Sequence, residues 1–178
     1  MKARVIDPRR LDMGRFAHEA GVLEGQWPLA SMPRLTDSVS HAPDAPLTWS
    51  ARGELREVRG EAPQVWLHLE GRAAVEMQCQ RCLGPVGHEL VVASRFRFEP
   101  DESAAAKLDA EIEDDVLAFT HELDLHDLFE DELLLALPLV PRHDDCRLPQ
   151  SSADTVMPAA EPRNPFAALA TLRKPPVD

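Results

Sequence analysis

Two short motifs of the sequence carry side chains that can bind a metal ion. Cys79 and Cys82 are separated by two residues and lead into a Gly-Pro step, and His143 and Cys146 have the same two-residue spacer. Two thiols on a glycine-containing turn are typical of a zinc knuckle, in which both sulfurs point at one tetrahedral ion. The second motif would complete a set of three cysteines and one histidine. These four residues are therefore a candidate structural zinc site.

Two other interpretations of the cysteines stay open at this point. The thiols could be reduced and free of metal at a turn, or they could form the redox pair of a dithiol oxidoreductase. A thioredoxin-type pair places its first cysteine at the N-terminus of a helix, whose dipole stabilises the thiolate. Gly84, Pro85 and Gly87 block a helix after Cys82. The sequence therefore predicts both thiols at a hairpin turn, which disfavours redox chemistry.

The motifs of common enzyme classes are absent from the sequence. It contains no P-loop, no dinucleotide-binding glycine pattern, no nucleophile elbow and no HExxH zinc motif. Adjacent carboxylates such as Asp114 and Asp115 stand inside a run of charge, where solvation is the simpler explanation. We therefore expect no enzyme and no small-molecule substrate.

Three segments alternate apolar and polar residues with the period of a β-strand. They span residues 47–55, 65–78 and 86–98, and turn-forming or charged residues separate them. The fold class that they predict is α+β, with an antiparallel meander that could curl toward a barrel. Helices are expected to cover this sheet.

Two helices are expected on the sheet. The first begins at an Asp7-Pro8 cap and ends at Gly21. The second is an amphipathic helix that Asp124 caps and Pro138 stops. Its predicted apolar stripe contains Leu125, Leu128, Phe129, Leu133, Leu135 and Ala136. The acidic residues Glu130, Asp131 and Glu132 are assigned to its solvent-facing side.

Length and charge limit the class of protein. The chain has 178 residues with 31 acidic and 19 basic side chains, a net charge of −12, and residues 99–132 hold 14 of the acidic ones. This length suits one domain with its own core. An odd cysteine count, a charged N-terminus and no apolar run of about 20 residues favour a cytoplasmic protein and exclude a membrane-spanning helix.

The C-terminal part differs in composition from the rest. We expect a single domain over residues 1–143 and a flexible tail over residues 144–178, where proline, serine and alanine are frequent. Residues 164–172 form an island with an Asn-Pro start and apolar spacing, which predicts a short docking helix. Its candidate contact residues are Phe166, Leu169 and Leu172.

Outward-facing arginines on the predicted strands are candidates for RNA binding. The set contains Arg52, Arg72, Arg81, Arg95 and Arg97, with Trp66 as a ring on which an unpaired base could stack. The alternative is that these arginines pair with glutamates of neighbouring strands and bind nothing. The sequence does not decide between the two.

Three blocks in sequence order resemble one protein family. They are the Cys79–Cys82 motif, the stretch from Glu130 to His143 followed by Cys146, and the Asn-Pro-Phe-Ala segment that starts at Asn164. Together they resemble the YceD family, the large ribosomal RNA subunit accumulation proteins of bacteria. Each motif is weak alone, but their order and spacing fit along nearly the whole chain.

The resemblance implies a non-enzymatic role in the synthesis, processing or stability of 23S rRNA. The implied partner is 23S rRNA or the pre-ribosomal large subunit, and direct contact with the RNA is one hypothesis. A second is an acidic module that holds a basic ribosomal protein or another biogenesis factor. Relatives in other bacterial lineages show a richer cysteine set around the segment after the helix, which resembles a zinc ribbon, whereas this chain has only His143 and Cys146 there.

Overall fold

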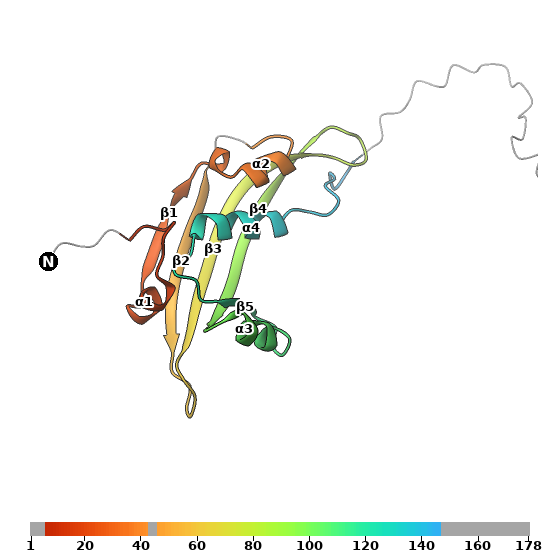
Figure 1. Cartoon of the computed structure of the whole chain (residues 1–178). Helices are drawn as coiled ribbons and strands as arrows, with labels where there is room; N and C mark the ends of the chain where they lie inside the picture. The colour runs from red at the N-terminus through yellow and green to blue at the C-terminus, as the bar shows by residue number, and fades with distance from the viewer. Residues whose placement is uncertain (1–5, 43–45, 147–178) are drawn as a thin grey trace, which may run out of the picture. The chain divides into compact units, whose positions relative to one another are not determined.

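The computed structural model describes residues 6–42 and 46–146, which form one sheet with helices packed against it (Figure 1). In chain order the elements are α1 (Met13–His18), β1 (Val22–Trp27), the 3-10 helix η1 (Leu29–Ser31), α2 (Pro33–Ser38), β2 (Leu47–Arg56), β3 (Gln64–Gln78), β4 (Pro85–Glu99), α3 (Glu102–Asp109), β5 (Asp115–Ala118) and α4 (Leu125–Leu135). The spatial strand order is β1-β2-β3-β4-β5. The predicted α+β class is confirmed.

The sheet is an antiparallel meander with one parallel strand added. β1 to β4 pair antiparallel in sequence order, and β5 pairs parallel to β4. The predicted strands coincide with β2, β3 and β4 because their alternation reflects one buried and one exposed face. β1 and β5 form opposite edges of the sheet, so the sheet is open and the curl toward a barrel is not found.

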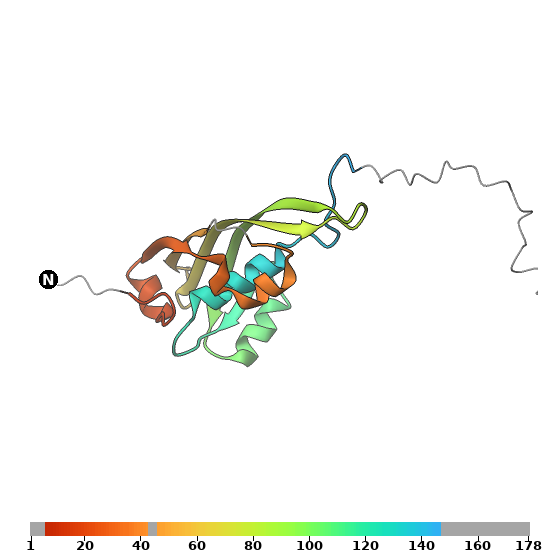
Figure 2. The same cartoon turned by 90° about the horizontal axis from the view of Figure 1, so that it is seen from above.

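One face of the sheet carries the hydrophobic core. Figure 2 shows α1, α2 and α4 on the same side of the strands. The core side chains of the central strands include Leu47, Trp49, Leu67, Leu69, Leu90, Val92 and Phe96. Their strand neighbours in sequence point to the other face, which we call the open face.

β1 has no counterpart among the predicted strands. Its residues alternate between exposed and partly buried, but Gly25 interrupts the apolar pattern. A Cβ atom on Gly25 would lie 3.1 Å from Cζ2 of Trp49, so the missing side chain makes room for the indole of the paired strand. Trp49 in turn stacks on Trp27, with ring centroids 4.1 Å apart. The glycine therefore reflects tertiary packing.

The N-terminal helix is shorter than predicted. α1 begins at Met13, and its cap is Asp12, whose carboxylate accepts from the amide of Arg15. The predicted cap, Asp7, instead accepts from the amide of Arg9 in a preceding turn. Gly21 lies beyond the helix, where a Cβ atom would come within 2.2 Å of the Phe16 ring. Close ring packing, and not helix capping, requires glycine there.

α4 lies across the core as predicted, but the prediction of which side chains it buries is wrong at two residues. Asp124 caps it by accepting from the amides of residues 126 and 127, and Phe129 packs over Gly71 of β3. Leu135, assigned to the apolar stripe, is 80% exposed, because at 100° per residue it points away from the side of the helix that buries Phe129 and Leu133. Glu130, assigned to the solvent side, is 2% exposed.

Glu130 is buried because it caps a second helix. Met32, the N-cap residue of α2, offers no side-chain hydrogen bond. The Glu130 carboxylate instead accepts from the backbone amides of Arg34 at 2.7 Å and Leu35 at 3.1 Å, and from the Arg34 guanidinium at 3.0 Å. A carboxylate at this end satisfies otherwise unpaired amides and complements the helix dipole. The contact fixes α2 on α4.

The acidic stretch of residues 99–132 contains regular structure. α3 begins after Asp101, whose carboxylate accepts from the amide of Ala104, and β5 follows at residues 115–118. None of the helices in the described part of the chain has the length and apolar character that crossing a membrane requires. The predicted docking helix over 164–172, with Phe166, Leu169 and Leu172, lies outside the described residues.

Replacing Glu130 with glutamine tests the link between α4 and α2. The variant loses the charge on three hydrogen bonds at a buried position, and we expect the free energy of unfolding to fall by about 1–2 kcal/mol. Urea denaturation measures it. The control is Asp131→Asn, which removes an exposed ion-pair partner of Arg34 and should have a much smaller effect. Equal losses in the two variants would contradict the capping role.

Candidate functional site

The candidate metal centre lies at the end of the β3–β4 hairpin. The two strands stay paired as far as Gln78 and Pro85, and the connecting turn carries Cys79 and Cys82. The amide of Cys79 donates to the carbonyl of Gly84, and the amide of Leu83 donates back to the carbonyl of Cys79, both at 2.9 Å. The thiols therefore project from the turn of a β-hairpin, as the sequence predicted, and neither begins a helix.

The second half of the cluster arrives from the segment after α4. The amide of Gln80 donates to the carbonyl of Pro141 at 2.9 Å, which ties this segment to the turn. His143 and Cys146 follow Pro141 and complete the group. One ligand atom from each of Cys79, Cys82, His143 and Cys146 lies within 4.8 Å of all the others. Tertiary folding thus joins two motifs more than 60 residues apart in the chain.

The spacing of the donor atoms fits a tetrahedral ion. Sγ of Cys79 lies 3.7 Å from Sγ of Cys146, and Sγ of Cys82 lies 3.5 Å from Nδ1 of His143. A tetrahedron with Zn–S bonds of about 2.3 Å has sulfur–sulfur edges of about 3.8 Å, and edges to a nitrogen ligand are slightly shorter. Three sulfurs and one imidazole are also the donors that Zn²⁺ prefers over Mg²⁺ or Ca²⁺.

The imidazole of His143 is oriented for ligation. Its Nε2 lies 2.8 Å from the carbonyl oxygen of Pro85, to which it donates, so Nδ1 faces the sulfur atoms with its lone pair. Metal-bound histidines generally make such a bond with their other nitrogen, which fixes the tautomer and the ring plane. The Pro85 carbonyl also raises the pKa of His143, because it holds the proton on Nε2.

The turn also prepares one thiol as an anion. Burial by itself would raise the pKa of Cys79, but the backbone amides of Cys82, Arg81 and His143 outweigh it and lower the pKa to about 5. For Cys146, burial and the neighbouring sulfurs act in the same direction and raise the pKa to about 11. A divalent cation would stabilise Cys79, Cys82 and Cys146 as thiolates, since a coordinated thiol loses its proton.

The metal candidates lie apart from the main core. Buried Cys79, Val86 and Cys146 form a small cluster of their own, with Cys82 packed against it. So few apolar side chains stabilise a turn only weakly, because each contributes roughly 1.5–3 kcal/mol on burial. Ligands shared between the turn and the segment after α4 would therefore supply much of the stability of this end of the hairpin.

The structure places the candidate RNA-binding residues in two different regions. Arg52, Arg72, Arg95, Arg97 and Trp66 stand at positions of the open face, whereas Arg81 lies in the cysteine turn. Trp66 is only 4% exposed, and the Arg56 guanidinium lies 4.7 Å from its ring centroid. The ring is therefore covered and presents no free face on which a base could stack.

Carboxylates accompany the open-face arginines. The ion pairs are Arg52–Glu54 at 3.9 Å, Arg72–Glu89 at 3.3 Å, Arg95–Asp114 at 2.5 Å and Arg97–Glu99 at 2.7 Å. Arg81 has no such pair within residues 6–42 and 46–146. Arg72–Glu89 joins neighbouring strands, which is the alternative noted from the sequence, whereas Arg52–Glu54 and Arg97–Glu99 each lie within one strand and Asp114 precedes β5.

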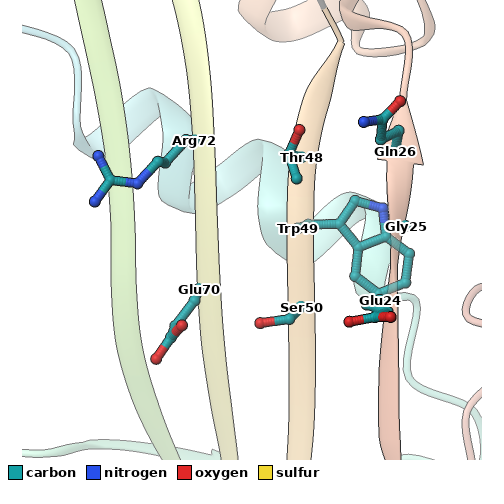
Figure 3. Close-up of a pocket in the computed structure, with 8 residues that line it drawn as sticks. All are labelled: Glu24, Gly25, Gln26, Thr48, Trp49, Ser50, Glu70 and Arg72. Carbon is teal, nitrogen blue, oxygen red and sulfur yellow. The ribbon is translucent and has the colours of Figure 1, made fainter.

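A shallow groove lies on the open face toward the cysteine turn. Figure 3 shows it from that face, with α4 behind the strands and the indole of Trp49 directed toward Gly25. Its charged lining residues are Glu24, Glu70 and Arg72. Two carboxylates against one arginine make this groove unsuitable for an anion such as phosphate.

Two residues that sequence reasoning did not single out stand next to the arginines. Nε2 of His68 lies 2.7 Å from a carboxylate oxygen of Glu54, and this bond is the main cause of the lowered pKa of Glu54. His68 is paired with Arg52 on β2 and with Arg95 on β4. Alternation gave His68 the correct face, but only the strand register brings it between two arginines.

Comparison with known proteins gives one consistent result. A family model described as large ribosomal RNA subunit accumulation protein YceD matches residues 67–173, from β3 through all four metal candidates. The protein of that name from Haemophilus influenzae is 33% identical over 121 residues, which cover 63% of this chain and 68% of the relative. No solved structure gives a significant match.

Elemental analysis tests the metal centre. Protein purified without chelator should contain about one zinc per chain, because Cys79, Cys82, His143 and Cys146 together offer the four ligands of one tetrahedral ion. The Cys79→Ser/Cys82→Ser variant should contain none, and a His121→Asn control, which changes an exposed histidine outside the cluster, should keep its zinc.

Hydrogen exchange provides a second readout for the same variants. The amide of Gln80 should lose protection in the double serine variant, while Leu69 in the core should keep it. Equal zinc content in the wild type and the double variant would refute the assignment.

Proposed function

Because the chain belongs to the YceD family of large ribosomal RNA subunit accumulation proteins, we propose that it is a non-enzymatic factor that supports the synthesis, processing or stability of 23S rRNA. It would act in the cytoplasm during assembly of the large ribosomal subunit. The observation that carries this proposal is the family match, which spans most of β3, all of β4 and α4, and the cysteine cluster. The proposal assigns no catalytic step to any residue.

In this proposal the metal centre has a structural role. Cys79, Cys82, His143 and Cys146 would hold a zinc ion that joins the hairpin turn to the segment after α4. The ion would supply charge neutralisation and rigidity, and all four of its positions would be filled by protein ligands. The turn would then present Arg81 and its neighbours in one fixed conformation.

Deleting the gene and measuring the two large rRNAs tests the proposed function. The ratio of 23S to 16S rRNA should fall in the deletion strain, and a wild-type copy should restore it. If the zinc is structural, the Cys79→Ser/Cys82→Ser copy should restore it less well than the His121→Asn copy. An unchanged ratio in the deletion strain would refute the proposal.

A second candidate function is the docking of a basic protein. Residues 101–115 hold seven acidic side chains and one basic one, and within the described residues only Asp114 of the seven forms an ion pair. α3 and β5 give this acidic segment a defined backbone, so it could recognise a basic ribosomal protein or another biogenesis factor.

Affinity purification distinguishes this second function. Replacing the acidic residues of the 109–115 segment with serine should reduce the recovery of basic ribosomal proteins if the acidic segment holds them. A control variant with Glu57→Ser and Glu61→Ser, which removes two acidic residues outside that segment, should not reduce it. Unchanged recovery in the first variant would reject this function.

A further inference from the structure

A row of three basic side chains crosses the open face of the sheet. His68 of β3 has Arg52 of β2 on one side and Arg95 of β4 on the other. Directly paired residues of antiparallel strands point to the same face, so all three project together. The side chains of Arg52 and Arg95 are 55% and 59% exposed, and that of His68 is 17% exposed.

The surroundings of this row carry no net negative charge. The charged groups that face it are Arg56, Arg97, Glu54, Glu70, Glu99 and Asp114, in addition to Arg52 and Arg95 themselves. Four arginines thus stand against four carboxylates, before any charge on His68 is counted. This balance contrasts with the net charge of −12 for the whole chain. A polyanion that approaches the protein is favoured at this part of the surface over the rest.

The ion pairs in the row can be exchanged for a phosphate. Exposed pairs of this kind contribute little to stability, because water competes for both partners. The Arg52–Glu54 separation of 3.9 Å is longer than a hydrogen bond, so the Arg52 guanidinium keeps its donors available. A phosphate can accept two parallel bonds from a guanidinium, which makes it an effective competitor.

We propose that Arg52, His68 and Arg95 form a binding site for a phosphate of the RNA sugar–phosphate backbone. The inference rests on the proposed function, which supplies RNA as the partner. Arg52 and Arg95 start two strand spacings apart, roughly 10 Å, so their long side chains can converge on one phosphate above His68. Because the Trp66 ring is covered, the site holds the backbone and does not read bases.

This proposal narrows the set of RNA contacts predicted from sequence. Arg72 belongs to the groove in Figure 3, where Glu24 and Glu70 oppose an anion. Arg81 stands in the cysteine turn, away from the row. Glu54 would act as a competitor of the phosphate, because its carboxylate already contacts His68, Arg52 and Arg56.

RNA binding by the full chain tests the site. Fluorescence anisotropy with a labelled 23S rRNA fragment would be measured over a series of salt concentrations. The Arg52→Gln/Arg95→Gln variant should bind about tenfold more weakly, and the slope of log affinity against log salt should be shallower by about one. The control Arg15→Gln, which removes an equally exposed, ion-paired arginine on α1, should match the wild type.

A second variant is expected to raise the RNA affinity, which distinguishes a specific effect from a loss of affinity caused by misfolding. Glu54→Gln removes the competing charge while it keeps an oxygen that can accept from His68. It should bind the RNA fragment about three- to fivefold more tightly than the wild type, because the local positive charge rises. A trivial folding defect cannot produce tighter binding.

The outcomes separate this inference from the proposed function. If the wild type binds RNA and both sets of substitutions leave its affinity unchanged, the phosphate site is wrong. If the wild type binds no RNA at the lowest salt, or binds polyglutamate in preference to RNA, the site is equally overturned. In either case the 23S to 16S ratio of the deletion strain still tests the proposed function independently.

Discussion

The pairing of β3 with β4 is the constraint on which the rest of the structure depends. The register runs without interruption from Val65 opposite Phe98 to Gln78 opposite Pro85. It assigns each side chain of two 15-residue strands to the core or to the open face. A shift of one residue would exchange the two faces and move the buried leucines into water. The same register carries the cysteine turn to the end of the hairpin.

The two ends of this hairpin are stabilised in different ways. At the sheet end, α1 and α4 cover a large apolar core, in which Phe129 packs directly over Gly71. At the turn, the buried cluster is reduced to Val86 and the cysteines. A side-chain cluster suited to zinc stands where the apolar core runs out. Metal coordination would suit this end of the hairpin, since a few coordinate bonds can replace many dispersion contacts in a small volume.

The fold also places acidic and basic side chains in different regions. Carboxylates gather where α3 and β5 extend the sheet, whereas arginines gather on the centre of the open face, where His68 lies between Arg52 and Arg95. Glu130 is the exception, because its carboxylate is buried at the start of α2 and satisfies backbone amides there. An acidic side chain thus serves as a solvated charge, an ion-pair partner or a helix cap, according to which groups the fold places next to it.

The sequence by itself determined the elements whose signals are local. Alternation located β2, β3 and β4, capping by Asp124 located α4, and residue spacing identified the two halves of the metal cluster. Tertiary structure alone decided that Gln80 meets Pro141, that Glu130 is buried and that His68 lies in a basic row. Periodicity and capping act over a few neighbouring residues, whereas these contacts join residues far apart in the chain. Their partners are fixed only when the strands pair and the helices dock.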